Sequence, residues 1–337
     1  MVDTKVLPLT AEHPDPGIIA SAVAVLKRGG LVAFPTETVY GLGADALNTM
    51  AVEKVFEAKG RPADNPLIVH IAHEDQLFDL IDEMPKKGSL LAKHFWPGPL
   101  TLVVKRTFLV PDIVTAHLDT VAVRMPNHPV ALELIRAFGG GLVGPSANLS
   151  GKPSPTTAQH VLNDLRGHVE IILDAGPTSL GVESTVVDVT IEPALILRRG
   201  GVTLESIRKV IDWVQTSEEI EMLRRSPGTR HRHYAPAAQV LLVEEGDYET
   251  YTRQVQTNRQ LGKKVGTIVH SSALVNLERS EFVRALPSSV DFIAQQLFGI
   301  LREMDELGVE VIVVEAVKED GIGAAVMDRL RRAAESS

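Results

Sequence analysis

The sequence predicts an α/β protein with two domains, and three observations lead to this prediction. The chain has 337 residues, which is more than one typical hydrophobic core holds. Short runs of apolar and β-branched residues alternate with segments of helical periodicity. The composition changes at about residues 214–237, and after residue 237 the alternation is regular enough to predict a small, parallel, Rossmann-like sheet.

The first part of the chain contains a series of short predicted elements after a loosely ordered arm at residues 1–16. Helices are predicted where apolar residues recur with a period near 3.6 and a glycine, proline or capping residue ends the run. These helices are Gly17–Arg28, Thr49–Lys59 (capped by Asn48), 74–82, 87–95, Pro129–Phe138, 157–165 and Leu204–Trp213. The predicted strands are Leu31–Phe34, Leu67–Ile71, Leu100–Val104, Val121–Val123, Leu142–Val143, 169–173, 185–189 and 195–198.

A polar linker separates this part from the second domain. Its core, LRRSPGTRHRHYAP, contains four arginines, two histidines, two prolines and no acidic residue, so it is too polar and too broken to be core. In the second domain the predicted strands are Val240–Val243, Val265–Val269 and Val309–Val314. The predicted helices there are 247–260, 289–306 and Ala324–Ala334.

The composition excludes several classes of function. There is no cysteine, which excludes disulfides, thiolate nucleophiles and cysteine-bound metal sites. The net charge of -9 and the aromatic content of 4% disfavour stable nucleic-acid binding as the main function. No apolar run approaches the roughly 20 residues needed to span a bilayer, and the first residues do not resemble a signal peptide. We therefore expect a cytoplasmic protein with no membrane partner.

Polar and charged residues gather around the two strands of the stretch 34–70. A turn of small and hydroxyl residues, PTETVYGLG, follows the first strand, and KGRPADNPL precedes the second, which ends at His70. Ligands of α/β folds usually bind at strand ends. Lys59 and Arg61 are suited to binding phosphate or carboxylate, but Lys-Gly-Arg-Pro is also typical of a helix C-cap, and both interpretations stand.

A second polar group follows Leu142–Val143 in the segment Gly144-Pro-Ser-Ala-Asn148. Ser146 lacks the setting of a nucleophilic serine, so donation of hydrogen bonds to phosphate is the better use, although a simple turn also fits. No P-loop motif is present. His70 and His73 have no third ligand nearby in the sequence, and we predict no protein metal site.

Together these motifs resemble the threonylcarbamoyl-AMP synthase family in its long, two-domain form. The motifs that carry the resemblance keep the family's order and spacing over residues 31–236. They are PTETVYGLG (35–43), KGRPADNPL (59–67), FWPGPLT (95–101), VAVRMP (121–126), GPSANLSG (144–151), ESTVVD (183–188), ILRRG (196–200) and SPGTRHRHYAP (226–236).

The resemblance implies a YrdC-like domain at 14–210, with a twisted open sheet and a concave ligand face. It also implies a linker at 211–237 that folds over the active site and a Rossmann-like α/β domain at 238–337. The implied reaction converts L-threonine, bicarbonate or CO2, and ATP into L-threonylcarbamoyl-AMP and pyrophosphate. Mg²⁺ is expected with ATP, held by phosphates and water, and no organic cofactor is expected. The product would pass to the machinery that transfers threonylcarbamoyl to the adenosine beside the anticodon of ANN-decoding tRNAs.

The resemblance also implies roles for individual residues. Thr38, His70, Arg124, Gly144 (through its backbone) and Ser184 are expected to bind L-threonine. Lys59, Arg61, Asn65, Thr120, Ser146, Asn148, Ser154, Arg198 and Tyr234 are expected to bind ATP. Of these, Lys59, Arg61, Ser146 and Asn148 are expected to act in catalysis, which would consist of charge neutralisation and positioning.

Two alternatives belong to other functional classes. The first is an RNA-binding module of the YrdC type, which the charge of -9 and the second domain disfavour. The second is carbamoyl transfer, as in hydrogenase-maturation proteins with a related domain. Those proteins carry additional cysteine-rich regions that this chain lacks.

Overall fold

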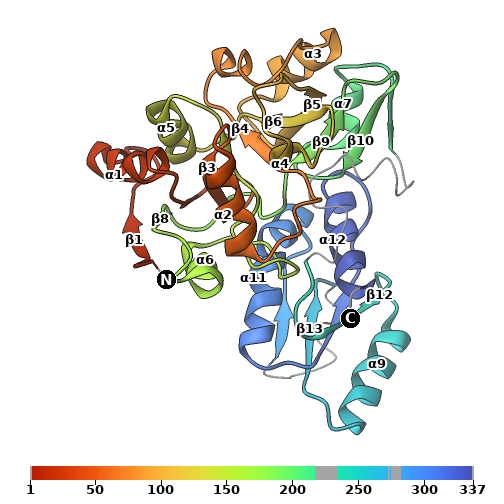
Figure 1. The fold of residues 1–337 in the computed structure, drawn as a ribbon. Coiled ribbons are helices and arrows are strands. Elements are labelled where there is room, and N and C mark those ends of the chain that lie inside the picture. The colour runs from red at the N-terminus through yellow and green to blue at the C-terminus, as the bar shows by residue number, and fades with distance from the viewer. Residues whose placement is uncertain (1, 217–233, 272–273, 275–281, 336–337) are drawn as a thin grey trace. The chain divides into compact units, whose positions relative to one another are not determined.

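A computed structural model describes residues 2–216, 234–271, 274 and 282–335 of the chain (Figure 1). The chain divides into two compact units. The first consists of residues 1–150, 154–179 and 183–231, and the second of 151–153, 180–182 and 232–337. Most of the predicted linker, residues 217–233, lies outside the described residues.

The first unit is built on one open, mixed sheet. Among the described residues its strand order is β1-β8-β2-β3-β7-β4-β6-β5-β9-β10-β11. The strands are β1 (Lys5–Pro8), β2 (Val32–Phe34), β3 (Gly41–Asp45), β4 (Ile68–His70), β5 (Leu100–Lys105), β6 (Thr120–Arg124), β7 (Leu142–Val143), β8 (Ile171–Asp174), β9 (Thr185–Asp188), β10 (Ala194–Arg198) and β11 (Val214–Thr216). The α/β class and the large open sheet are therefore confirmed, whereas the concave ligand face stays a prediction.

Local sequence signals explain where the helices of this unit begin and end. The Asp15 carboxylate accepts hydrogen bonds from the first amides of α1, and Asn48 caps α2 in the same way. Gly60 ends α2 with φ at 58°, as the C-cap interpretation predicts. The helices are α1 (Pro16–Lys27), α2 (Thr49–Lys59), the 3-10 helix η1 (Glu74–Leu77), α3 (Lys86–Phe95), α4 (Asp112–Thr115), α5 (Pro129–Phe138), α6 (Ala158–Leu165) and α7 (Leu204–Arg208).

Four of the predictions for this unit are wrong. Residues 1–16 are not a loose arm throughout, because Lys5–Pro8 pairs in parallel with β8. The helix predicted at 74–82 is only the short η1, and the helix predicted from Leu204 ends at Arg208. Val214–Thr216, assigned to the linker, pairs with β10 as an edge strand.

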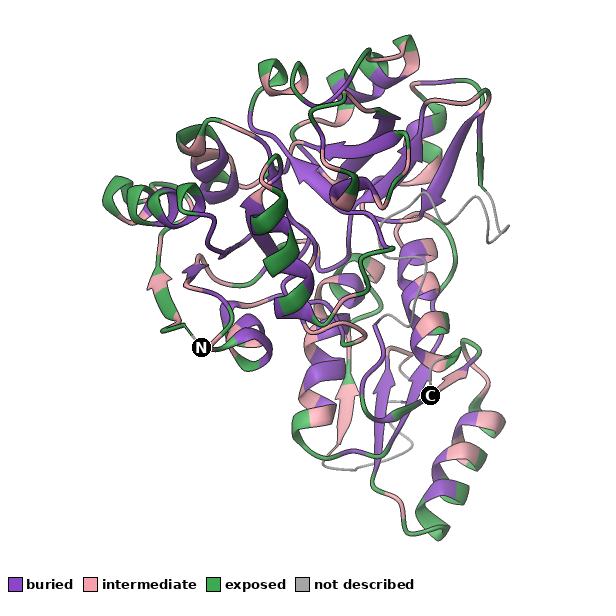
Figure 2. Cartoon of the chain, in the orientation of Figure 1, coloured by how far each residue is buried: buried purple, intermediate pink, exposed green. Residues whose placement is uncertain are grey.

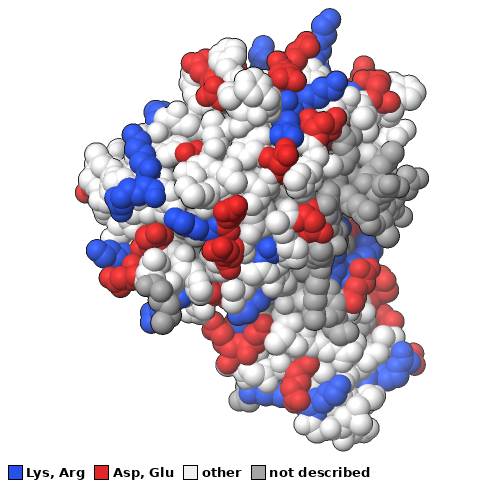
Figure 3. Space-filling view, in the orientation of Figure 1, with Lys and Arg blue, Asp and Glu red and all other residues white. Residues whose placement is uncertain are grey.

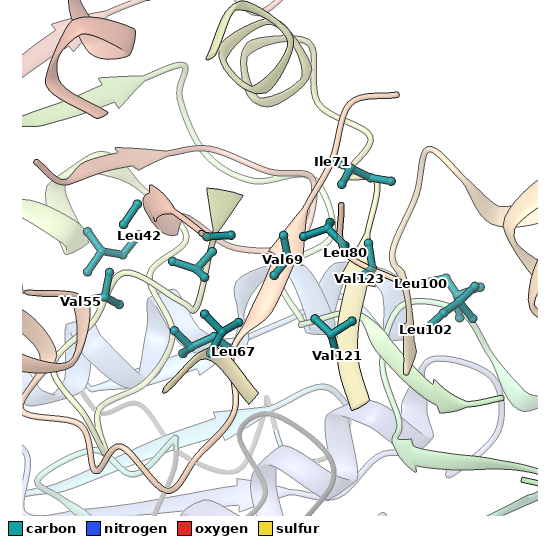
Figure 4. Packing of buried hydrophobic residues seen from close by; sticks show 14 of the residues in the cluster. Leu42, Val55, Leu67, Val69, Ile71, Leu80, Leu100, Leu102, Val121 and Val123 are labelled. Carbon is teal, nitrogen blue, oxygen red and sulfur yellow. The ribbon is translucent and has the colours of Figure 1, made fainter. Parts of the chain in front are cut away.

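The core of the first unit lies on both faces of the sheet. Figure 2 shows its central strands coloured almost wholly as buried, as expected for a sheet covered on both sides. Helix α2 and the neighbouring strands enclose one apolar cluster, and α1 with α5 encloses another. Figure 4 shows part of the first cluster, in which Leu42, Val69, Leu102 and Val123 come from four different strands. This packing holds the strand ends that carry the polar residues.

The second unit is a parallel sheet with helices, as predicted. Its described strands have the order β12-β15-β13-β14, and every pairing is parallel. Its elements are β12 (Gln239–Val243), α9 (Tyr248–Gln260), β13 (Val265–Val269), β14 (Val283–Ala285), α11 (Val290–Glu306), β15 (Val311–Glu315) and α12 (Gly323–Glu335). Among the residues described in both units, no helix has the length and apolar character needed to cross a membrane.

Candidate functional site

Strand register brings His70 and Arg124 together. The strands β4 and β6 are parallel neighbours, and His70 pairs directly with Arg124 at their carboxyl ends. The side chains of both residues are buried in the first unit. Two residues that are 54 positions apart in sequence thus form the centre of the predicted amino-acid site.

Three groups hold the guanidinium of Arg124. Its Nε donates to the carbonyl oxygen of Gly98 at 3.1 Å, and its Nη1 donates to Thr38 Oγ1 at 2.9 Å. Its Nη2 lies 2.7 Å from Glu37 Oε1, an ion-pair distance without the geometry of a hydrogen bond. Because Arg124 carries five N–H donors, further donors remain for a ligand carboxylate.

The turn after β2 fixes Thr38 in this arrangement. Thr36 Oγ1 lies 2.8 Å from Thr38 Oγ1 and donates to the carbonyl oxygen of Val39 at 2.6 Å. Both threonines are buried. The hydroxyl residues of PTETVYGLG therefore close a turn and present one oxygen to Arg124.

The surroundings of His70 favour an uncharged imidazole. Burial lowers its pKa well below the ordinary value, and the nearby charge of Arg124 lowers the pKa further. Its ring packs edge-on against Phe34, with the ring centroids 5.9 Å apart. Its Nδ1 is buried and has no hydrogen-bond partner within the described part of the chain. A buried nitrogen in this state is suited to a hydrogen bond with a ligand.

Gly144 lies directly against this histidine. A Cβ atom at Gly144 would come within 2.6 Å of His70 Nδ1, so a glycine is needed for the two segments to approach. The N–H of Gly144 donates to the carbonyl oxygen of Ile68 at 2.9 Å. Of the backbone groups of Gly144, the carbonyl is therefore the one better placed for the predicted ligand contact.

Ser184 is held by residues from two strands, β5 and β10. Its hydroxyl lies 2.7 Å from Thr101 Oγ1, and Arg198 Nη2 donates to Ser184 Oγ at 3.1 Å. The Nε and Nη2 of Arg198 also donate to the carbonyl oxygen of Ser184, at 3.1 and 3.0 Å. Arg198, which the sequence assigns to ATP, thus positions a residue that the sequence assigns to threonine.

Lys59 joins the end of α2 to the Gly144–Asn148 segment. Its Nζ, on a buried side chain, lies 2.5 Å from the carbonyl oxygens of both Ser146 and Asn148. The amide of Ser150 donates in turn to the carbonyl oxygen of Lys59 at 2.8 Å. The cation therefore holds the loop that carries Ser146 and Asn148, which places three of the four predicted catalytic residues together.

Arg61 and Asn65 lie in the segment that follows. Arg61 Nη2 donates to the carbonyl oxygen of Pro66 at 3.1 Å, and Asn65 is fully buried. Ser154 is buried and donates to Glu183 Oε1 at 2.5 Å. Thr120 begins β6, at the opposite end of that strand from Arg124, and its place in an ATP site stays a prediction.

Tyr234 belongs to the second unit. It is buried there with φ at 65°, and its ring stacks on Phe298 with the centroids 5.5 Å apart. The guanidinium carbon of Arg329 lies 4.9 Å from the centre of the ring. The predicted role of Tyr234 over the nucleotide stays a prediction.

The structure adds three residues that the sequence analysis did not select. Glu37 lies beside Arg124, Thr101 contacts Ser184, and Glu183 accepts from Ser154. Each lies inside a motif already quoted, which is the signal that could have identified it. None could be assigned from the sequence, because each role depends on a partner from a distant segment of the chain.

Two family models together cover most of the chain. One, described as "Telomere recombination", matches residues 24–200, and one described as "Threonylcarbamoyl-AMP synthase, C-terminal domain" matches residues 202–335. The chain is 49% identical over 323 residues to a threonylcarbamoyl-AMP synthase of Pyrococcus abyssi, covering 94% of this chain and 93% of that protein. It is 46% identical over 323 residues to the Bacillus subtilis protein of the same name, covering 94% and 92% of the two chains.

The chain is also similar to proteins of known structure. The crystal structure of Pyrococcus abyssi Sua5 complexed with L-threonine matches with a TM-score of 0.92 at 46% identity, covering 98% of each chain. The Escherichia coli YciO structure matches with a TM-score of 0.52 at 22% identity, covering 59% of this chain and 96% of that one. This second likeness concerns the fold alone.

Proposed function

The chain belongs to the threonylcarbamoyl-AMP synthase family, and we propose that it converts L-threonine, bicarbonate or CO2, and ATP into L-threonylcarbamoyl-AMP and pyrophosphate. As a member of this family it is an enzyme of the nucleotidyltransferase type. The proposal extends this assignment to the substrates and to the residues that act on them.

The observation that carries the proposal is the buried cluster around Arg124. A guanidinium with free donors, a neutral imidazole and a hydroxyl lie together at the carboxyl ends of β4 and β6. These groups are complementary to a small molecule that has a carboxylate and a hydroxyl. L-Threonine has both, and a relative with 46% identity has been solved with L-threonine.

In the proposed complex Arg124 binds the carboxylate of the amino acid. His70 Nδ1 and Ser184 Oγ provide the hydrogen bonds that select a hydroxyl-bearing side chain. A site built to bond a hydroxyl discriminates strongly against analogues that lack it, because its own buried polar groups would then be unsatisfied. Valine should therefore be a far poorer substrate than threonine.

The chemistry proceeds in two steps. The threonine ammonium first loses a proton to water, and the resulting amine nitrogen bonds to the carbon of CO2. One C=O π bond of CO2 opens to an oxyanion and a second proton passes to water, which gives a carbamate. A carbamate oxygen then bonds to the α-phosphorus of ATP while the bond between that phosphorus and the bridging oxygen breaks, so that pyrophosphate leaves. Because both reactants are anionic, the protein's main task is to neutralise charge and to align the reacting atoms.

The residues assigned to ATP are suited to this task. Lys59, Arg61 and Arg198 bring three cations, while Ser146 and Asn148 add a hydroxyl and an amide. Groups of this kind bind phosphate oxygens and do not form a carboxylate cage for a metal ion. Mg²⁺ would therefore enter with ATP, coordinated by the phosphates and water.

The product of this reaction is a mixed anhydride, and it requires an acceptor. We propose that a tRNA threonylcarbamoyl-transferase system takes it up, in the cytoplasm, without stable binding of nucleic acid by this chain. On the face shown in Figure 3, basic and acidic side chains intermingle, which is not the single-sign pattern that favours a phosphate backbone.

The test is pyrophosphate release by the full chain with ATP, Mg²⁺, bicarbonate and a panel of amino acids. Release that requires both L-threonine and bicarbonate supports the proposal, and no release above background contradicts it. Arg124→Gln should abolish release at moderate threonine concentrations. Arg136→Gln is the matched control, because Arg136 is exposed and pairs with Glu133 on the surface of α5. Equal loss in both variants would argue against a role for Arg124 in substrate binding.

A further inference from the structure

The Glu37 carboxylate occupies a costly position in this site. Its side chain is only 10% exposed, and neither of its oxygens has a hydrogen bond within the described residues. A carboxylate taken out of water without hydrogen bonds is expensive to bury, even beside a cation. The pair with Arg124 therefore needs an explanation beyond stability.

The charge of Glu37 is balanced by Arg124 and not by the histidines around the pair. His70, which faces Arg124, is neutral because burial and the guanidinium lower its pKa. The pKa of His128, on which the charge of Glu37 acts, also lies below the ordinary value, because burial outweighs the attraction of the carboxylate. Among the described residues, Arg124 is the one cation within ion-pair distance of Glu37. The pair is thus close to neutral overall.

We propose that Glu37 is a specificity residue that makes the carboxylate site of Arg124 selective for zwitterionic amino acids over simple carboxylate anions. The inference rests on the proposed function, because it assumes that the ligand carboxylate binds at Arg124. Glu37 would act on the ligand through the electric field that its carboxylate and the Arg124 guanidinium produce together.

The physical basis is the net charge that a ligand meets. A lone buried guanidinium attracts every carboxylate of suitable size. With the glutamate 2.7 Å from Nη2, the attraction for a ligand of charge -1 is largely cancelled. A zwitterion has no net charge, and it gains from placing its carboxylate toward Arg124 and its ammonium toward Glu37. Selectivity of this kind arises because Glu37 weakens the binding of the competing anion more than that of the zwitterion.

Calorimetric titration of the full chain with two ligands tests this inference. L-Threonine is compared with (R)-3-hydroxybutanoate, which keeps the carboxylate and the hydroxyl but lacks the ammonium. The wild-type chain should bind threonine at least about tenfold more tightly, as expected for a charge-assisted contact. Equal affinities would overturn the inference without the use of any variant.

Glu37→Gln provides the second measurement. The dissociation constant for (R)-3-hydroxybutanoate divided by that for L-threonine should fall by about tenfold or more in this variant. Glu37→Asp should restore part of this ratio. The ratio is taken within one protein, so a smaller folded fraction does not change it. A ratio within twofold of the wild-type value overturns the inference.

The two proposals fail in different ways. If the wild-type chain neither binds L-threonine nor releases pyrophosphate with it, the proposed function fails and this inference fails with it. If release depends on threonine but Glu37→Gln leaves the ratio unchanged, only the inference about Glu37 fails.

Discussion

Replacement of Gly144 by alanine tests whether the position of His70 controls threonine binding. The added Cβ would lie 2.6 Å from His70 Nδ1, 2.8 Å from Cε1 and 3.2 Å from the ring of Phe34. The ring of His70 would have to withdraw by roughly 1 Å to reach an ordinary contact distance of about 3.5 Å. Gly144 is not among the residues with positive φ, so the conflict is steric and not conformational.

The magnitude follows from how tightly the histidine is enclosed. His70 is 2% exposed and packs edge-on against Phe34, so its ring has little room to move. Overpacking of this kind costs about 1–3 kcal/mol of stability. Loss of one neutral hydrogen bond to the ligand is worth about 0.5–1.5 kcal/mol, or roughly three- to tenfold in affinity. The KM for L-threonine should therefore rise roughly three- to tenfold, while the KM for ATP stays close to its wild-type value.

The assay is pyrophosphate release with threonine varied at saturating ATP and bicarbonate, alongside a thermal melt. Gly140→Ala is the control, since its Cβ would meet only the ring of Phe138, at 3.3 Å. The reasoning is refuted if Gly144→Ala leaves the KM for threonine within twofold of the wild type. It is also refuted if the KM values for threonine and ATP rise together.

Three further predictions concern stability. Gly200→Ala places a Cβ 2.3 Å from the backbone carbon of Ser184, where no side chain can move aside. We expect the free energy of unfolding, measured by chemical denaturation, to fall by about 3 kcal/mol or more. A fall below about 1 kcal/mol would contradict the geometry. Lys59→Met removes the donor to two loop carbonyls. It should lower the free energy of unfolding by about 1–3 kcal/mol in the same denaturation experiment and raise the KM for ATP. An unchanged KM for ATP in a folded variant would show that the cation is only structural. The folded-state pKa of His70 lies below the unfolded value of 6.5. Its neutral form therefore contributes stability that is fully present above pH 6.5 and is lost as the pH falls from 6.5 toward the folded-state pKa. His70→Gln should therefore show a smaller drop in melting temperature between pH 7.5 and 5.5 than the wild type, and equal drops would show that His70 is not the group responsible.

The sequence predicted those elements whose signals are local. Asn48 and Gly60 mark the ends of α2, and the structure shows both caps. The strand β3 was missed because Gly41–Asp45 consists mostly of small residues, which have low strand propensity. It forms because its neighbours β2 and β7 supply the hydrogen bonds, and this information is not local. The edge strand β1 was missed because it forms by pairing with β8, which is distant in the sequence.

The candidate site was predictable as a set of residue types but not as an arrangement. The motifs identified Arg124 and His70, yet nothing in either motif gives the register that pairs them. Glu37 and Glu183 lie in two other motifs, PTETVYGLG and ESTVVD. An acidic residue next to an expected carboxylate or phosphate site looks unfavourable until its partner is known. The partners, Arg124 and Ser154, are brought in by distant segments.

Hydrogen bonds connect a residue expected to bind ATP to a residue expected to bind threonine. Arg198, expected to bind the nucleotide, donates three hydrogen bonds to Ser184, which is expected to bind threonine. The arginine thus already holds one wall of the proposed threonine pocket. If ATP draws the guanidinium of Arg198 toward its phosphates, Ser184 has to respond. Coupling between two ligands is reciprocal, so threonine would then alter ATP binding by the same factor. Arg198 would thus couple the binding of threonine, which supplies the nucleophile, to the binding of ATP, which supplies the electrophile.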